Sequence, residues 1–394
     1  MMREHRLEVA DVFRTYEKEF FAQWGHVLGA DQRQAFEAIR DCRTAALGAH
    51  AELVEQCDTC GHRVISYNSC RNRHCPKCQA MARAEWLEAR EKELLPVPYF
   101  HVVFTLPRQI GGLALQNGRE IYSILFRAAS ETLLGIAADP GRMGARIGFL
   151  AVLHTWGQAL QLHPHLHCVV PGGGISRDGR RWIGCRSKSF FLPVEVLGCR
   201  FRNLFLIYLR KAFQAGRLKF HGEMAALARP AAFETMCRRA RRIRWVVYAK
   251  PPFGGPGQAL KYLARYTHRV AISDQRLLSM EDGRVTFTYK DYADGGKKKV
   301  MTLEATEFIR RFLLHILPRG FVRIRQFGFL ANRARGKKLA QCRTLLGAAP
   351  RENQVTAERK SDKRCPVCQT GRMVLIGIMC HVGAPRSVPG LDTS

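Results

Sequence analysis

Two short cysteine motifs near the N-terminus could together bind one metal ion. Cys57 and Cys60 form one Cys-x-x-Cys motif, and Cys75 and Cys78 form another after 14 intervening residues. The two-residue gap lets both thiolates of a motif point at the same ion, and two motifs complete a closed tetrahedral site of the structural zinc type. The sequence therefore predicts one Zn²⁺ ion on these four cysteines.

Further ligands and cations lie in the same segment. His62, Cys70 and His74 leave open a second ion or an exchange of ligands at the first. Arg71 and Arg73 lie between the two motifs, and we expect them to contact the phosphates of a nucleic acid.

A third motif of this kind stands near the C-terminus. Cys365 and Cys368 have the same spacing, and Cys380 and His381 follow eleven residues further on. These four ligands predict a possible second zinc site, and the alternative is a terminal segment that binds no metal.

One stretch of the chain, HPHLHCVV from residue 163, is rich in histidine. Side chains alternate between the two faces of a strand, so His165 and His167 share a face. Two imidazoles one pleat apart can bind the same ion, provided that a third ligand is near. The alternate residues, which can pack in a core, are Leu166, Cys168 and Val170.

The third ligand has several candidates. His154 ends the preceding predicted strand, and antiparallel pairing would bring it to the face of His165 and His167. We prefer His154. The alternative is His163, which has the right parity but lies at the strand entrance, and Gln158 is a more remote one.

A pair of tyrosines could supply nucleophiles. Tyr262 and Tyr266 are four residues apart, so both phenols lie on one face of a predicted helix. Such a pair commonly packs in a core, but Lys261, Arg265 and Arg269 make this helix basic and partly exposed. We therefore take the phenols as candidate catalytic groups and the three cations as candidate DNA contacts.

The charge of the chain points to a polyanionic partner. The 394 residues include 63 lysines and arginines against 33 aspartates and glutamates, a net charge of +30. Such a field favours phosphate backbones through counterion release and disfavours acidic partners. Fourteen cysteines without an export signal favour metal sites over disulfides. No apolar run approaches the ~20 residues of a spanning helix, so we expect a cytoplasmic protein with no membrane partner.

The elements that must position these residues alternate irregularly, which predicts an α+β fold with a largely antiparallel sheet. Strands are expected at 99–106, 147–155 and 165–170, and helices at 117–138, 194–214 and 258–269. Five regions follow along the chain: a helical N-terminal region (1–50), a zinc-binding module with its following helix (51–95), a core (97–275), an extension with a β-meander and a basic helix (276–349), and a linker with the possible second zinc motif (350–394).

The order of these motifs resembles the rolling-circle transposases of the insertion sequence 91 type. They form a two-tyrosine branch of the HUH (His-hydrophobic-His) superfamily of single-strand nucleases. The stretches CRNRHCPKC, LHPHLHCVVPGGG and YLARYTHRVAIS look like that family's own, and the similarity runs over about residues 51–346. The resemblance implies an antiparallel HUH-nuclease sheet with flanking helices, histidines on a central strand, and an N-terminal transposase zinc-binding domain.

The resemblance also implies an activity, which is nicking and joining of single-stranded DNA at the ends of a mobile element. Attack by Tyr262 or Tyr266 would leave a 5′-phosphotyrosine and a free 3′-hydroxyl. Hard phosphate oxygens and imidazole ligands make Mg²⁺ or Mn²⁺ the expected ion of the nuclease site. The sequence has no nucleotide-binding phosphate loop, so strand unwinding is expected from a host helicase in the bacterial cytoplasm or nucleoid.

Two rival functions share part of this pattern. A plasmid replication initiator or relaxase would use the same nuclease site, and the N-terminal zinc module favours the transposase over it. A zinc-dependent nucleic-acid-binding protein without catalysis would explain the charge and the cysteines. It would leave the histidine strand and the tyrosine pair without a role.

Overall fold

The structure is a computed structural model that describes residues 7–47, 52–185, 191–250, 258, 270–292, 294–348 and 364–379. The chain forms two compact units. Unit 1 contains residues 1–81, 272–316 and 352–394, and unit 2 contains residues 82–271 and 317–351. Both units are therefore built from segments that are not contiguous in sequence, which differs from the five successive regions predicted above.

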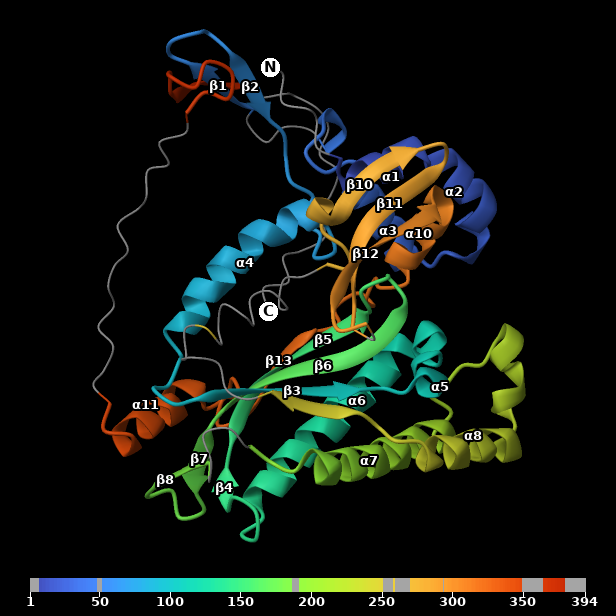
Figure 1. Ribbon diagram of the computed structural model, residues 1–394, viewed down its shortest axis with the longest axis vertical. Helices are drawn as coiled ribbons and strands as arrows, with labels where there is room; N and C mark the ends of the chain where they lie inside the picture. Colours follow the sequence, from blue (N-terminus) through green and yellow to red (C-terminus); the bar gives the residue numbers. More distant parts are fainter. Residues whose placement is uncertain are drawn as a thin grey trace. The chain divides into compact units, whose positions relative to one another are not determined.

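Unit 2 is organised around a five-stranded sheet with the order β13-β5-β6-β3-β9 (Figure 1). Every neighbouring pair in it is antiparallel, so the predicted α+β fold with an antiparallel sheet is confirmed. The strands are β3 (Tyr99–Thr105), β5 (Gly148–Trp156), β6 (Leu162–Pro171), β9 (Val247–Lys250) and β13 (Ile324–Gly328). The predicted histidine strand is β6, the central strand.

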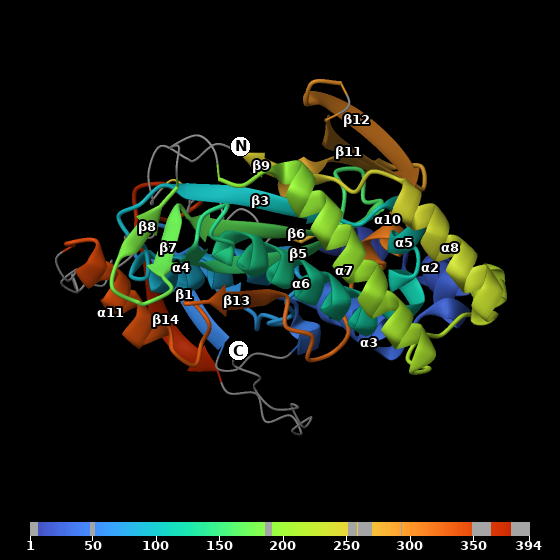
Figure 2. The ribbon, with the colours of Figure 1, turned by 90° about the horizontal axis from the view of Figure 1, so that it is seen from below.

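Helices cover one face of this sheet, as Figure 2 shows for α6 (Ala114–Ala138) and α7 (Val194–Gln214). Leu166, Cys168 and Val170 of β6 are buried in the core on this face, as predicted. Two further helices of unit 2 are α5 (Arg108–Gly111) and α8 (Pro230–Arg242), the latter preceded by the 3₁₀ helix η3 (Gly222–Ala228). Among the described residues α6 alone is long and apolar enough to cross a membrane, and 67% of its most apolar stretch is buried, as is usual for a core helix.

A second, smaller core lies on the opposite face of the sheet. Leu150, Val152 and Val169 of β5 and β6 pack there with Leu339 and Cys342 of α11 (Arg335–Leu345). A three-stranded sheet of the same unit contains β4 (Ala145–Arg146), β7 (Gly173–Ser176) and β8 (Trp182–Gly184). His154, His165 and His167 lie on this same face of the sheet, next to the smaller core.

In unit 1 the N-terminal helices pack with the segment that precedes residue 316. The Phe13 ring stacks on Phe36 at 4.8 Å and meets Phe312 edge-on at 5.4 Å. Because aromatic burial joins these segments, residues 1–50 do not form a separate region. The elements are α1 (Val9–Thr15), α2 (Glu17–Trp24), η1 (Gly25–Val27), α3 (Ala30–Arg40), η2 (Ala45–Leu47), η4 (Asp274–Arg276), β10 (Leu277–Glu281), β11 (Arg284–Asp291), β12 (Lys297–Glu304) and α10 (Ala305–Leu313).

Strands β10, β11 and β12 form one three-stranded sheet of unit 1, and another sheet joins distant parts of the sequence. Its order is β14-β1-β2, and β1 (Glu52–Cys57) pairs antiparallel with both β2 (Arg63–Ser66) and β14 (Met373–Met379). The helix α4 (Pro76–Glu91) follows the cysteine-rich segment.

Candidate functional site

The antiparallel register of β5 and β6 brings three histidines together. His154 lies opposite His165, and His167 is two residues further along β6 on the same face. One ring nitrogen from each of the three lies within 4.8 Å of the others. We call His154, His165 and His167 the histidine cluster. Its face of the sheet is opposite to the core formed with α6 and α7.

The ring nitrogens of the histidine cluster have the spacing of ligands to one ion. His165 Nε2 and His167 Nε2 are 3.0 Å apart. His165 Nδ1 lies 2.5 Å from the carbonyl oxygen of His163, which can only accept, so Nδ1 carries the proton and Nε2 keeps its lone pair. Two nitrogens bound to one ion at about 2.1 Å and at right angles lie about 3.0 Å apart. The donor set therefore fits a divalent ion.

A fourth histidine contacts the cluster from the neighbouring strand, on the same face of the sheet. His101 lies on β3 with its Nε2 atom 2.8 Å from His167 Nδ1. Its side chain is 3% exposed. Burial, with a smaller contribution from the positive charge of Lys250, lowers the pKa of His101 to about 4. At neutral pH the His101 ring is therefore uncharged, and its Nε2 atom can accept a hydrogen bond from His167 Nδ1.

Burial also keeps His165 of the cluster uncharged. It lowers the pKa of His165 to about 3, against the opposing effect of the His163 carbonyl. The Trp156 ring stacks on His154 at a centroid distance of 4.5 Å and covers one side of it. Neutral imidazoles have the free lone pairs that metal binding requires.

The structure brings the preferred third ligand, His154, into the cluster. His163 contributes its backbone carbonyl, but its ring is exposed and is not part of the group. Gln158 does not belong to the group either. Sequence reasoning missed His101, although it lies in the predicted strand 99–106 and shares a face with His167 once β3 pairs with β6.

The tyrosine helix is not part of the described structure. Tyr262 and Tyr266, with the neighbouring Lys261, Arg265 and Arg269, lie outside the residues that the structure describes. Their candidate roles rest on the sequence.

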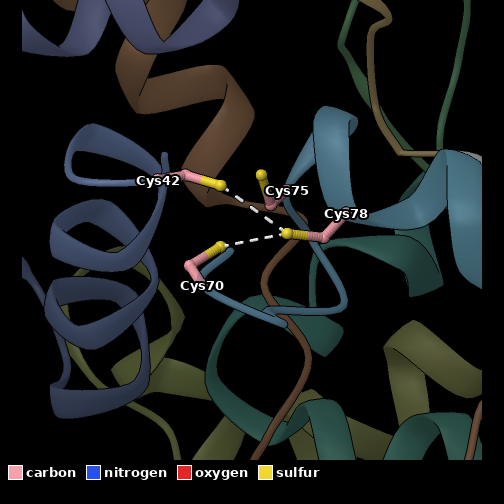
Figure 3. A group of neighbouring side chains, drawn as sticks. All are labelled: Cys42, Cys70, Cys75 and Cys78. Atoms are coloured by element: carbon pink, nitrogen blue, oxygen red, sulfur yellow. Dashed lines mark hydrogen bonds between the residues drawn. The ribbon is translucent and has the colours of Figure 1, made fainter. Parts of the chain in front are cut away.

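Four cysteines of unit 1 form a compact group that Figure 3 shows. Cys78 Sγ lies 3.6 Å from Cys42 Sγ and 3.5 Å from Cys70 Sγ. Cys75 completes the group and, with Cys78, lies at the N-terminus of α4, where the helix dipole favours thiolates. We call Cys42, Cys70, Cys75 and Cys78 the first cysteine cluster.

The remaining N-terminal motif has different partners. Cys57 Sγ lies 3.6 Å from Cys368 Sγ, and Cys60 Sγ lies 3.6 Å from Cys365 Sγ. We call Cys57, Cys60, Cys365 and Cys368 the second cysteine cluster, and all of its sulfurs are within 4.8 Å of one another.

These groups correct the predicted ligand sets. The structure does not bring Cys57 and Cys60 to Cys75 and Cys78, because the pairing of β1 with β14 turns the first motif toward the C-terminal one. Instead, Cys42 and Cys70 complete the group with Cys75 and Cys78. Cys42 has no other cysteine close to it in sequence. Cys380 and His381, the other predicted ligands of the C-terminal motif, lie outside the described residues.

The predicted DNA contacts of the cysteine-rich segment lie beside the first cysteine cluster. Arg71 and Arg73 are in the loop between Cys70 and Cys75, and the Arg71 side chain is exposed. Arg71 has a φ of 50°, a left-handed conformation at the turn that follows the first of these cysteines.

Two family models match the chain. One is described as "Transposase zinc-binding domain" and matches residues 12–106. It contains all four ligands of the first cysteine cluster but only half of the second. The other is described as "Putative transposase" and matches residues 148–338, which include the histidine cluster.

Two relatives identified from their sequences agree with these models. A Sinorhizobium fredii protein, y4qJ, with the same description as the second model, is 56% identical over 392 residues, which is 96% of this chain and 97% of that protein. The transposase for insertion sequence element IS801 of Pseudomonas savastanoi pv. phaseolicola is 29% identical over 322 residues, or 80% of this chain and 75% of that protein. A solved structure of the conjugative relaxase TrwC with a 27-mer DNA covers 63% of this chain and 74% of its own at 16% identity, with a TM-score of 0.24.

Proposed function

Because the chain belongs to the transposases of the insertion sequence 91 type, we propose that it nicks and rejoins single-stranded DNA at the ends of a mobile element through a 5′-phosphotyrosine intermediate. The observation that carries this proposal is the convergence of His154, His165 and His167 on the central strands of an antiparallel sheet. A replication initiator or relaxase could share that site, and the zinc-binding domain favours the transposase.

The histidine cluster would hold the divalent ion, Mg²⁺ or Mn²⁺, which when bound polarises the scissile phosphate and fixes its orientation. The residues around the cluster prepare it for that role. The His163 carbonyl holds the His165 proton on Nδ1, so that Nε2 faces the site. The sheet fixes both rings, since His154 and His165 are directly opposed in register.

His101 acts as a positioning residue for His167. When His167 presents the lone pair of Nε2 to the ion, its proton is on Nδ1 and points at His101 Nε2, 2.8 Å away. His101 accepts this proton in a hydrogen bond because burial keeps its own ring neutral. Such outer hydrogen bonds typically change metal affinity by a factor of about 10–100.

The proposed nucleophile is Tyr262 or Tyr266. The phenolate oxygen forms a bond to phosphorus, the bond between phosphorus and the 3′ oxygen breaks, and that oxygen leaves as a 3′-hydroxyl after it takes up a proton. The reverse attack by a 3′-hydroxyl rejoins the strand, so no nucleotide is consumed. An ordinary phenol has a pKa near ~10, and Lys261, Arg265 and Arg269 are the neighbouring charges in sequence that would favour the phenolate.

The proposed substrate is bound through its phosphates. Arg71, Arg73 and the three cations of the tyrosine helix are the assigned contacts. The exposed arginines at the end of α8 add a basic surface in unit 2. We place the reaction in the bacterial cytoplasm and assign strand separation to a host helicase.

The experiment is a search for the covalent protein–DNA adduct on a denaturing gel. The DNA is single-stranded, covers the ends of the element that encodes the chain, and is labelled at its 3′ end, because the downstream fragment stays on the tyrosine. Wild type should form the adduct with Mn²⁺, and Tyr262→Phe/Tyr266→Phe should form none. Tyr292→Phe is the matched control, since Tyr292 is 71% exposed and lies outside the motif.

Histidine variants test the ion-binding group in the same assay. His165→Ala and His154→Ala should each lower adduct formation at least about 100-fold, whereas His163→Ala should retain most of it because its ring is not a ligand. Full activity of the double tyrosine variant would refute the proposal. Tight DNA binding without any adduct would favour the non-catalytic rival.

A further inference from the structure

We propose that the second cysteine cluster, Cys57, Cys60, Cys365 and Cys368, binds its own Zn²⁺ ion, so that the chain carries two cysteine zinc sites. The matched zinc-binding domain ends at residue 106, which leaves Cys365 and Cys368 outside it. The first cysteine cluster already provides a complete set of four ligands within that domain. The second site is independent of the proposed DNA reaction.

The sulfur positions fit a single tetrahedral ion. Four sulfurs at about 2.3 Å from one zinc ion lie about 3.8 Å apart. The two cross-motif distances, Cys57 to Cys368 and Cys60 to Cys365, are both 3.6 Å. Neither pair is bonded as a disulfide. These two distances are close to the tetrahedral value, and the other sulfur pairs lie within 4.8 Å.

The two motifs are conformational copies of each other. In each, an amide four residues after the first cysteine donates to that cysteine's carbonyl, from Gly61 to Cys57 at 3.2 Å and from Gln369 to Cys365 at 3.1 Å. Gly61 and Gln369 both have left-handed backbones, with φ values of 72° and 60°. The same backbone turn recurs about 300 residues apart in sequence, with both copies facing one point.

Backbone amides also point at the sulfurs, as expected for thiolates. Thr59 N and Cys60 N each lie 3.4 Å from Cys57 Sγ. In the C-terminal motif, Val367 N lies 3.4 Å from Cys365 Sγ and Gly371 N lies 3.3 Å from Cys368 Sγ. Such hydrogen bonds offset the negative charge that four thiolates bring to one ion.

The sheet holds the two motifs in register. Cys57, the last residue of β1, lies opposite Met373 at the start of β14. Asp58 N donates to Arg372 O at 3.1 Å, and Arg372 N donates to Asp58 Oδ1 at 2.9 Å. A Cβ atom on Gly371 would lie 2.4 Å from Cys57 Sγ, so only glycine leaves room there for the sulfur.

The ligand set selects zinc. Four thiolates in tetrahedral arrangement suit Zn²⁺ or an iron–sulfur centre, and hard ions such as Mg²⁺ prefer oxygen. A cluster of several irons would spread the four sulfurs over different metal atoms, farther apart than these. With all four positions filled by protein, the site is closed and structural. It would fasten β14 to β1.

The test measures zinc per full-length chain in purified protein. Wild type should hold two zinc ions, and Cys365→Ser/Cys368→Ser and Cys57→Ser/Cys60→Ser should each hold one. The variant with all four substitutions should also hold one, because both pairs bind the same ion. The control Cys199→Ser, at an exposed cysteine of α7, should keep two. Zinc content should be unchanged in His165→Ala/His167→Ala, which excludes a contribution from the histidine cluster.

Three results would overturn the proposal: a single zinc ion in wild type, two zinc ions in Cys365→Ser/Cys368→Ser, or iron in place of zinc. A measurement on wild type avoids any folding defect of the variants. Alkylation of native protein followed by mass spectrometry should find Cys57, Cys60, Cys365 and Cys368 protected together. A chelator should expose all four in step, although Cys60 is an exposed residue. Rapid alkylation of Cys365 before chelation would contradict the site.

Discussion

His101 contacts the histidine cluster through His167. The burial of His101 makes the stability of the chain depend on pH. The ordinary histidine pKa of 6.5 applies to the unfolded chain, whereas the folded pKa is about 4. Below pH 6.5 the unfolded chain therefore takes up a proton at residue 101 that the folded chain does not. The free energy of unfolding falls as the pH drops from about 6.5 to about 4, and at pH 8 the residue contributes no pH dependence.

We predict that His101→Gln removes this part of the acid sensitivity. Between pH 7 and pH 4 the wild type should lose on the order of 3 kcal/mol more than the variant, since one pKa unit is about 1.4 kcal/mol. The measurement is urea unfolding followed by tryptophan fluorescence, with a chelator present. An equal loss in the two proteins would contradict the burial-driven shift. His101→Gln should also keep more Mn²⁺ affinity than His101→Phe, because the amide oxygen can still accept from His167.

At the scale of elements, local patterns predicted the fold better than they predicted the metal groups. The helix expected at 194–214 is α7 (Val194–Gln214), and the strand expected at 99–106 is β3 (Tyr99–Thr105), because their signals lie within a few neighbouring residues. A Cys-x-x-Cys motif likewise fixes its own turn. Its partner motif depends on strand pairing over 300 residues, between β1 and β14, which no local pattern contains.

The edge strand β13 depends on a glycine. Gly328 has a φ of 62°, and a Cβ atom there would lie 1.9 Å from the carbonyl oxygen of Ile147. Gly328→Ala should therefore lower the free energy of unfolding by at least about 2 kcal/mol. It should also reduce adduct formation, since β13 pairs with the strand that carries His154.

Gly336→Ala is the matched control for this prediction. Gly336 lies in α11, and a Cβ atom there meets nothing within 4 Å. This substitution should stabilise the chain by up to about 1 kcal/mol through helix propensity. Urea unfolding of both variants makes the comparison, and equal effects would show that the close approach at Gly328 is unimportant.

At the scale of the molecule, the positive charge is concentrated in places that suit a polyanion. The end of α8 has four exposed arginines, and Glu234, the acidic residue of that helix, is already paired with Arg210 at 2.8 Å. One carboxylate therefore faces four arginines within this helix, and the end of α8 keeps a net positive charge. The arginines are Arg238, Arg239, Arg241 and Arg242.

We predict that replacing these four arginines by glutamine weakens binding of single-stranded DNA and flattens its salt dependence. The slope of log K against log salt should fall by about 0.7 for each arginine that contacts a phosphate. Titrations of a labelled oligonucleotide at several salt concentrations measure it. The control replaces four exposed lysines of unit 1 by glutamine, which removes the same charge. If both sets of substitutions change the salt slope equally, α8 makes no local contact with the DNA. The control residues are Lys18, Lys290, Lys297 and Lys298.

The pairing of β1 with β14 has a consequence for damaged copies of the gene. A frameshift or stop codon after Gly328 and before position 364 would spare every strand of the histidine-bearing sheet, since β13 ends at Gly328. The product would nevertheless lack β14, leaving an open strand edge and the two thiols of Cys57 and Cys60 without partners. We expect such shortened proteins to oxidise or aggregate. Mutations near the 3′ end of the reading frame would therefore inactivate an element even though the sequence that encodes the histidine-bearing sheet is intact.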